Sequence, residues 1–284
     1  NGVIKIGKFY LKRGLQSLSN SKPIEVVFRD GQIDILQWLL VGEETQFKLE
    51  GKNFNLKNLD FTLNGQAELT LLHLFAPFLE DLGGKAEISV AVKGDLLKPE
   101  ILGSARTKEA YIRVPGLPHP FEKVNSEISF SHTRAMINNA KAQFAGGTIN
   151  LEGQFEIMGV RDILTNIRAS VQGVKLNIPD HILTQGNADL TITGNWFPFT
   201  LSGSYHVMGG LIDKEFGDET IENTTKQSIY LPKQLIEASF QPLLLDIQVI
   251  MQKNLRMKNS QIDGYLTGAL HINGSPSKPS LRGD

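Results

Sequence analysis

The stretch that decides the fold is GKAEISVAVKG, residues 84–94, in which every second residue of the central part is apolar. Ala86, Ile88, Val90 and Val92 alternate with residues of which Lys85, Glu87, Ser89 and Lys93 are charged or polar. Successive side chains of a β-strand point to opposite faces, so this spacing places the apolar row on one face and the polar row on the other. The stretch therefore predicts a β-strand with one buried and one solvated face.

The same period of two recurs along the chain, with clear examples in residues 149–157, 188–192 and 243–251. Alternation of this kind is typical of antiparallel sheets that are buried on one side. Helical spacing is rare. Residues 69–82 (LTLLHLFAPFLEDL) predict a short helix that acts as core or plug, and residues 228–240 hold a second candidate. The sequence predicts an all-β protein with minor helix.

Composition excludes several classes of protein. The chain has 284 residues, no cysteine, and 29 Lys and Arg against 30 Asp and Glu. The absence of cysteine excludes disulfide frameworks, thiolate metal sites and cysteine nucleophiles. A nearly neutral charge argues against a nucleic-acid-binding domain, and a hydrophobic content of 40% argues against a disordered chain. The sequence also lacks an apolar run of the length that a membrane-spanning helix needs.

A Gly-Pro-Gly pattern repeats along the chain, with the two glycines nine residues apart in each copy. The copies are Gly94–Pro99–Gly103, Gly194–Pro198–Gly203 and Gly274–Pro279–Gly283. Glycine supplies positive φ angles and close backbone approach, and proline cannot take a central position in a ladder. The pattern predicts a turn begun by the first glycine, a connection stiffened by proline, and a second strand begun by the second glycine.

Repeats of this kind indicate a modular β architecture in which each unit adds strands to its neighbour. We expect residues 1–284 to form one continuous, repeat-built piece of a longer protein. Residues 1–41 either begin the same sheet or form a separate or capping segment.

The apolar face must be covered. Four aliphatic side chains on one strand gain roughly 6–12 kcal/mol when they leave water, at about 1.5–3 kcal/mol each. A second sheet, closure into a barrel, or an apolar guest could provide the cover. A two-sheet β-sandwich remains one alternative, and the repeat favours an open groove.

Motifs of known catalytic chemistry are missing from the sequence. It contains no P-loop, no His-Glu-x-x-His and no Gly-x-Ser-x-Gly. The six histidines are scattered, and acidic pairs such as Glu43–Glu44 lack the partners of a calcium site. We expect no catalytic residue, no metal and no cofactor.

Residues 84–103 (GKAEISVAVKGDLLKPEILG) resemble the "strand, Gly, Pro, aliphatic, Gly" unit of the TamB family. Residues 146–153, 203–216 and 243–283 are similar to further segments of that family, whereas residues 1–41 match nothing recognisable. The resemblance implies a long, curled antiparallel sheet that forms an open taco or half-pipe with a hydrophobic interior. It also implies a periplasmic location, with the full-length protein anchored in the inner membrane by a segment outside this chain.

The resemblance implies phospholipid as the ligand and an outer-membrane β-barrel protein of the BamA/TamA type as the partner. The first hypothesis is that the groove shelters acyl chains during lipid transport from the inner to the outer membrane. A second is that it receives β segments of outer-membrane proteins or autotransporters by strand addition. A third is a passive structural β domain. The predicted groove-lining residues are Ile88, Val90, Val92, Ile149, Leu151, Leu190, Ile192, Leu245, Ile247, Val249, Leu270 and Ile272.

Overall fold

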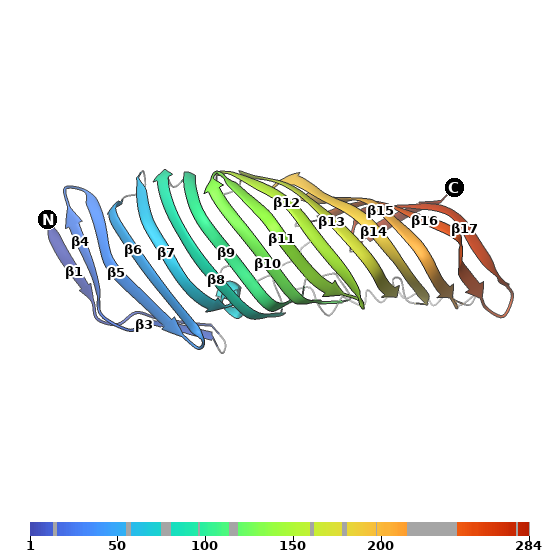
Figure 1. Cartoon of the computed structure of the whole chain (residues 1–284), viewed down its shortest axis with the longest axis horizontal. Coiled ribbons are helices and arrows are strands. Elements are labelled where there is room, and N and C mark those ends of the chain that lie inside the picture. The colour runs from blue at the N-terminus through green and yellow to red at the C-terminus, as the bar shows by residue number, and fades with distance from the viewer. Residues whose placement is uncertain are drawn as a thin grey trace. The chain divides into compact units, whose positions relative to one another are not determined.

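A computed structural model of the chain shows a protein built almost entirely of β-strands (Figure 1). It describes residues 1–13, 16–54, 58–74, 81–95, 97–113, 119–159, 162–177, 181–196, 198–214, 243–276 and 278–283.

The first nine strands belong to the N-terminal part of the chain. They are β1 (Gly2–Ile6), β2 (Tyr10–Arg13), β3 (Gln16–Asn20), β4 (Ile24–Arg29), β5 (Gln32–Gly42), β6 (Thr45–Phe54), β7 (Leu59–Glu68), β8 (Asp81–Asp95) and β9 (Lys98–Arg113). The other nine are β10 (Phe121–His132), β11 (Arg134–Phe144), β12 (Gly147–Gly159), β13 (Asp162–Asn177), β14 (Ile182–Asn195), β15 (Phe199–Ile212), β16 (Leu243–Lys258), β17 (Asp263–Ser275) and β18 (Lys278–Gly283).

Neighbouring strands in sequence are mostly neighbours in the sheet. β4 to β8 pair consecutively and antiparallel, β1 pairs with β4, and β3 of the β2–β3 hairpin pairs with β5. The strands form one sheet that is not closed into a barrel. The prediction of an all-β protein with an open sheet is therefore confirmed, and the two-sheet sandwich is not the arrangement observed.

One pair of strands differs from this pattern. β15 and β16 pair in parallel, while β14–β15, β16–β17 and β17–β18 are antiparallel. A parallel pair requires a long crossover, and residues 213–242 separate the two strands. The sequence did not predict this exception, because the apolar-polar alternation of β16 is the same in either direction.

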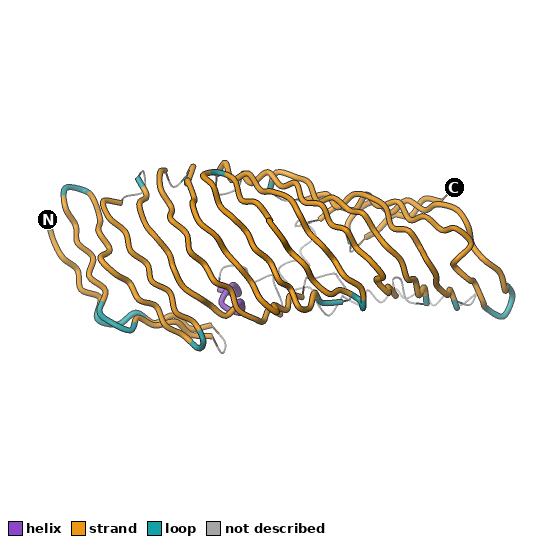
Figure 2. Tube along the Cα trace, in the orientation of Figure 1, coloured by secondary structure: helices purple, strands orange, loops and turns teal. Residues whose placement is uncertain are grey.

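The predicted helix over residues 69–82 is only partly present. Residues 69–74 form a short 3-10 helix, η1 (Leu69–Leu74), which Figure 2 shows as the purple segment. Asp81 and Leu82 belong instead to β8, so the helix end predicted at residue 82 is wrong. Leu82 continues the alternating row of β8 and is buried with Leu69. Residues 75–80 and the second helical candidate, residues 228–240, lie outside the described part of the chain.

The chain forms two compact units. Unit 1 consists of Asn1–Ile112, Lys123–Ala140 and Glu152–Leu164, and unit 2 of Arg113–Glu122, Lys141–Leu151 and Thr165–Asp284. β9 to β13 contribute residues to both. In each unit, we call the sheet face that carries the buried apolar clusters the core face, and the opposite face the polar face.

Candidate functional site

The core face of unit 2 carries continuous rows of apolar residues across β14, β15, β16 and β17. Residues paired in register project from the same face of a sheet, so the pairings define the rows. The rows are Ile192–Leu201–Leu245–Gly274, Leu190–Gly203–Ile247–Ile272 and Ala188–Tyr205–Val249–Leu270.

The aliphatic side chains of these rows remain partly accessible. We call Leu190, Ile192, Leu201, Leu245, Ile247, Val249, Leu270 and Ile272 the aliphatic strip; all eight are half-buried. Further along the same strands, Val207, Met251 and Leu255 are buried. One end of the core face is thus closed, and the strip beside it leaves apolar surface within reach of a ligand.

Half of the predicted groove-lining residues lie in one apolar cluster of unit 2. These six are Ile149, Leu151, Leu190, Ile247, Val249 and Leu270. Ile192, Leu245 and Ile272 adjoin them in the rows of the aliphatic strip. The remaining three, Ile88, Val90 and Val92, lie on β8 of unit 1, opposite Gly65, Leu63 and Phe61 of β7.

The repeated glycines set the backbone of the hairpins. Gly94, Gly194, Gly274, Gly103 and Gly203 all have positive φ. A Cβ on Gly103 would overlap the carbonyl oxygen of Ser89, and one on Gly203 would overlap that of Asp189. These two positions therefore require glycine both for their φ angle and for the close approach of the neighbouring strand.

The expected order of turn and strand in the repeat is wrong in one respect. β9, β15 and β18 begin at Lys98, Phe199 and Lys278, so the second glycine of each copy lies inside the strand. Pro99 and Pro279 likewise lie one residue inside their strands, and Pro198 directly precedes β15. The ladder begins earlier than predicted because proline is tolerated at the start of a strand, where the missing N–H disturbs the ladder least.

Several residues of the closed end were not predicted as lining. Tyr205 is buried, and its hydroxyl donates a hydrogen bond to Thr184 Oγ1 at 3.1 Å. Burial raises the pKa of the Tyr205 phenol above its ordinary value. Val207 and Leu255 are the most buried members of the cluster after Val174. The alternation within 203–212 and 243–258 could have placed these residues on the core face, but it could not distinguish the closed end from the open one.

The core face of unit 1 is covered in part by its own helix. Leu69 of η1 is buried together with Leu82, Ala86 and Ala110. Leu71 is buried with Leu18 and Ala67, and Phe47 packs against them. Small alanines under η1 leave room for the leucines of the helix, so this part of the core face has a cover supplied by the chain itself.

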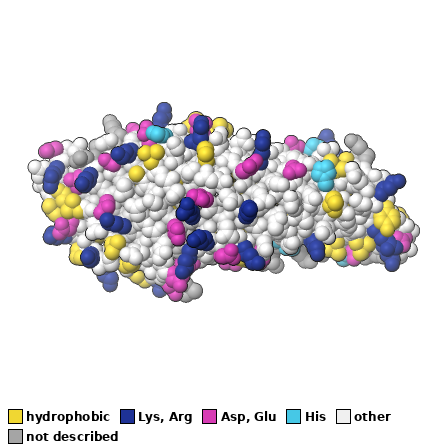
Figure 3. Space-filling model, in the orientation of Figure 1, with side chains coloured by type: hydrophobic (Ala, Val, Ile, Leu, Met, Phe, Trp, Pro, Cys, Tyr) yellow, Lys and Arg dark blue, Asp and Glu magenta, His cyan; other side chains and the backbone are white. Residues whose placement is uncertain are grey.

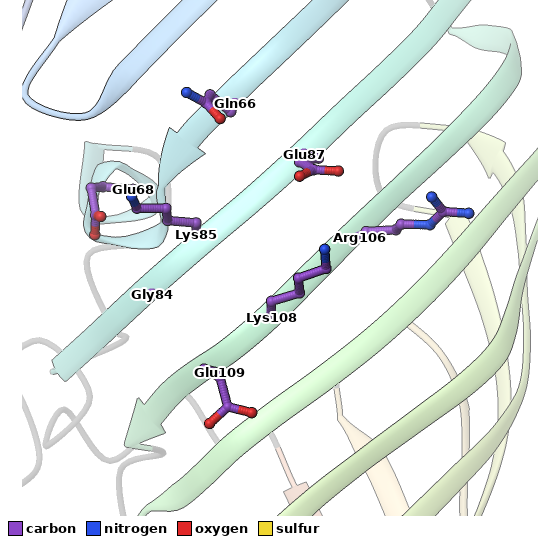
Figure 4. Close-up of a pocket in the computed structure, with 8 residues that line it drawn as sticks. All are labelled: Gln66, Glu68, Gly84, Lys85, Glu87, Arg106, Lys108 and Glu109. Atoms are coloured by element: carbon purple, nitrogen blue, oxygen red, sulfur yellow. The ribbon is translucent and has the colours of Figure 1, made fainter.

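A polar depression of about 310 Å³ lies in unit 1 (Figure 4). It is lined by Gln66, Glu68, Gly84, Lys85, Glu87, Arg106, Lys108 and Glu109. Lys85 pairs with Glu44 at 2.9 Å and Arg106 with Glu127 at 2.7 Å. Burial raises the pKa of Glu68, and its neighbour Glu44 raises it further. Figure 3 shows such charged side chains of both signs spread over the face turned to the viewer. The depression is part of an ion-paired polar surface.

Histidines of unit 2 pair with single carboxylates on the polar face. His181 Nδ1 lies 3.2 Å from Asp213 Oδ1, and His271 Nε2 lies 2.6 Å from Asp246 Oδ1. Among the described residues, no group of three or more His, Asp or Glu side chains is placed to hold a metal ion. In the same residues, none of the helices has the length and apolarity that crossing a membrane would need.

Comparison with known proteins identifies one family. The family model described as the TamB C-terminal domain matches residues 138–284, which is more than half of the chain. No curated protein and no solved structure matches the chain. The matched residues contain the aliphatic strip and two of the three copies of the Gly-Pro-Gly repeat.

Proposed function

We propose that this chain, which belongs to the TamB family, shelters the acyl chains of phospholipids on the apolar core face of its sheet during their transport from the inner to the outer membrane. The family is associated with the cell envelope, works with outer-membrane partners and is not a family of enzymes. In this proposal the protein acts in the periplasm, without catalysis or cofactor, and the full-length protein is anchored in the inner membrane outside this chain.

The observation that carries the proposal is the aliphatic strip of β14 to β17. Its side chains are aliphatic and half-buried, and the rows they form are continuous across four strands. Each such side chain gains about 1.5–3 kcal/mol when it is fully removed from water, and the share that belongs to its remaining exposed surface is still available to a guest. An acyl chain can supply the missing contact without a specific polar partner.

Gly203 contributes to the same surface. It lies in register between Leu190 and Ile247, and it is exposed. Because glycine has no side chain, the row is lowest at this position, and a linear apolar guest can cross the row there. The predicted lining residues Ile88, Val90 and Val92 belong to the same proposal in unit 1, where they are half-buried on β8.

The decisive experiment compares Ile247→Asp with Gln248→Asp. The two residues are neighbours on β16, and Gln248 is exposed on the polar face. Lipids are extracted from each purified protein after expression in a diderm bacterium and quantified by mass spectrometry. We expect phospholipid with the wild type and with Gln248→Asp, and little with Ile247→Asp while circular dichroism still reports β structure. Phospholipid retained at wild-type level by a folded Ile247→Asp protein would contradict the proposal.

A second candidate function is the reception of β segments of outer-membrane proteins by strand addition. The observation that favours it is the exposure of two outlying strands: every residue of β1 and of β18 is exposed. Backbone groups on such strands can pair with an incoming strand of a β-barrel protein of the BamA/TamA type or of one of its substrates.

Photocrosslinking discriminates between the two functions. A photoreactive residue at position 247 reports on the aliphatic strip, and one at position 281 of β18 reports on the exposed strand. Lipid adducts at 247 support the first function. Protein adducts at 281, without lipid adducts at 247, support the second.

A further inference from the structure

The polar face of unit 2 carries an apolar row at one end of β14 to β17. Leu183 pairs in register with Leu211, Leu211 with Arg256, and Arg256 with Tyr265. Leu183 is 47% exposed and Tyr265 is 65% exposed. Met208, 60% exposed, projects nearby from the irregularity in β15 between Val207 and Gly210. Isolated apolar residues are common on protein surfaces, but three of these four strands each contribute an apolar residue to one row, and the fourth contributes Arg256.

The middle of the same strands shows what the polar face carries elsewhere. There the row in register is Asp189–Ser204–Gln248–His271. All four side chains are polar, as expected for a face in water. The neighbouring row, Asn187–His206–Ile250–Ala269, is half polar. The row at the strand ends, with two leucines and a tyrosine, is the most apolar of the three.

The core face is apolar at the same strand ends. Ile182 pairs with Ile212, and Ile212 pairs with Met257. The residues that follow Ile182 and precede Ile212 are Leu183 and Leu211 of the polar face. These strand ends are thus apolar on both faces. On the core face these residues are already covered, because Ile212 is buried and Ile182 and Met257 pack against the same cluster. The apolar surface that this end leaves for a partner is therefore the row on the polar face.

Basic residues accompany the row. Lys214, Lys253 and Lys258 are exposed at or near these strand ends. The two described acids there are already engaged: Asp213 lies against His181, and Asp263 accepts two hydrogen bonds from Arg256 at 2.9 and 2.8 Å. Arg256 lowers the pKa of Asp263, so this carboxylate stays ionised and paired. Figure 3 shows hydrophobic and Lys or Arg side chains next to one another at the right-hand border of the view.

We propose that this end of β14 to β17 docks on the surface of a phospholipid membrane, with Leu183, Met208 and Tyr265 in the interfacial layer and the lysines on anionic headgroups. Tyrosine has an apolar ring and a polar tip, which suits the boundary between headgroups and acyl chains. Lysine extends its apolar stem while its ammonium group reaches a phosphate. The docking surface is separate from the aliphatic strip, since it lies on the opposite face of the strands and at their ends.

A single fluorescent label tests the proposal directly. The chain has no cysteine, so Met208→Cys can be labelled alone with the environment-sensitive dye NBD. The probe is vesicles of phosphatidylethanolamine and phosphatidylglycerol at a ratio of about three to one. The matched control is Met136→Cys, at a methionine of β11 that is 45% exposed. We expect at least a two-fold rise in emission with a blue shift at position 208, and none at position 136.

A second set of variants measures the contribution of the row to binding. Leu183→Ser combined with Tyr265→Ser should lower the vesicle-bound fraction in a flotation assay at least ten-fold. Leu102→Ser combined with Met136→Ser, two exposed residues elsewhere, should lower it less than two-fold. Lys253→Gln combined with Lys258→Gln should weaken binding to these vesicles several-fold and leave binding to pure phosphatidylcholine unchanged, because the electrostatic part needs anionic lipid.

Three results would overturn the proposal. One is a wild-type protein that does not float with the anionic vesicles. Another is an equal loss of binding in the row variants and in the control pair. The third is a label at position 208 that does not respond to vesicles, which would leave a protein partner as the occupant of the row. Ile247→Asp distinguishes membrane docking from the proposed sheltering of lipid. A folded Ile247→Asp protein should lose bound phospholipid and still float with the vesicles.

Discussion

The hairpin of β8 and β9 and the hairpin of β14 and β15 carry two copies of the same repeat, and they differ in what covers them. In both, the second glycine has positive φ and lies against an aliphatic residue of the first strand: Gly103 against Val90, and Gly203 against Leu190. The repeat thus fixes the backbone of the hairpin and the position of one aliphatic residue beside each glycine.

The cover over each hairpin is decided by residues outside the repeat. On the first, Leu69 of η1 packs with Ala86 and Ala110. On the second, a Cβ at Gly186 would lie 2.8 Å from atoms of the Tyr205 ring, and one at Gly210 would lie 2.7 Å from Leu255 Cδ1. Small residues on the core face make room in both hairpins, for a helix in one and for large side chains of the sheet in the other.

The largest expected effect comes from replacing the second glycine of the repeat, which has the same backbone role in both hairpins. Gly203→Val and Gly103→Val each force a branched side chain onto a positive φ and into a neighbouring carbonyl, so each should destabilise the protein by more than about 4 kcal/mol. Urea denaturation measures the change. The control is Gly209→Ala, where no atom lies within 4 Å of the added Cβ, and it should change stability by less than about 1 kcal/mol. If Gly103→Val were tolerated and Gly203→Val were not, the two hairpins would not share the same backbone constraint.

The next effect separates the closed end of unit 2 from the aliphatic strip. Leu255 is 3% exposed, so Leu255→Ala should cost about 3 kcal/mol through lost burial and the cavity it leaves. Leu245 is half-buried, and Leu245→Ala should cost only about 1 kcal/mol, because its side chain is already partly in water. Thermal and urea unfolding of both variants in lipid-free protein test this difference. Equal losses would mean that the strip is ordinary core.

A third change tests the cover of the first hairpin. Leu69→Ala removes a buried contact of η1 and should destabilise the protein by about 2 kcal/mol. Hydrogen exchange should speed up in β8 and β9 and stay unchanged in β15 and β16. Leu97→Ala, at an exposed leucine of the β8–β9 turn, should shift stability by less than about 0.5 kcal/mol. Faster exchange in β16 with Leu69→Ala would contradict a cover that is local to unit 1.

The alternation of apolar and polar residues was enough to predict the faces of the strands. Ile88, Val90 and Val92 project from the core-facing row of β8, and Ile247 and Val249 from that of β16, as the period of two requires. The same signal could not give strand direction, so the parallel pair of β15 and β16 was missed. It also could not separate the accessible strip from the closed end, since accessibility depends on what other segments place over each residue.

Two local features could not be predicted from the spacing of apolar residues along the sequence. The core-facing alternation of β8 begins at Leu82, inside the apparent helix, and the tertiary contact of Leu82 with Leu69 overrides the helical spacing. The apolar row of Leu183, Leu211 and Tyr265 is assembled from three strands. Each residue alone is an ordinary surface residue, and only the register brings them together.

The smallest expected effect concerns the polar group on the closed end. Tyr205→Phe removes the hydrogen bond to Thr184 and should cost about 1 kcal/mol at neutral pH. Burial raises the pKa of Tyr205 above 10.0, so the folded protein holds the phenolic proton more tightly than the unfolded chain does. This contribution to stability is complete below the unfolded pKa near 10 and is lost as pH rises through the folded pKa.

The urea stability of wild type and Tyr205→Phe should therefore converge as pH rises above about 10, because only the wild type loses this contribution. Tyr265→Phe, at the exposed tyrosine of the polar face, serves as the control and should run parallel to the wild type over the same range. A gap between wild type and Tyr205→Phe that stays constant through the alkaline range would mean that the phenol is solvated in the folded state. The closed end would then be open to water, and the contrast between it and the aliphatic strip would fail.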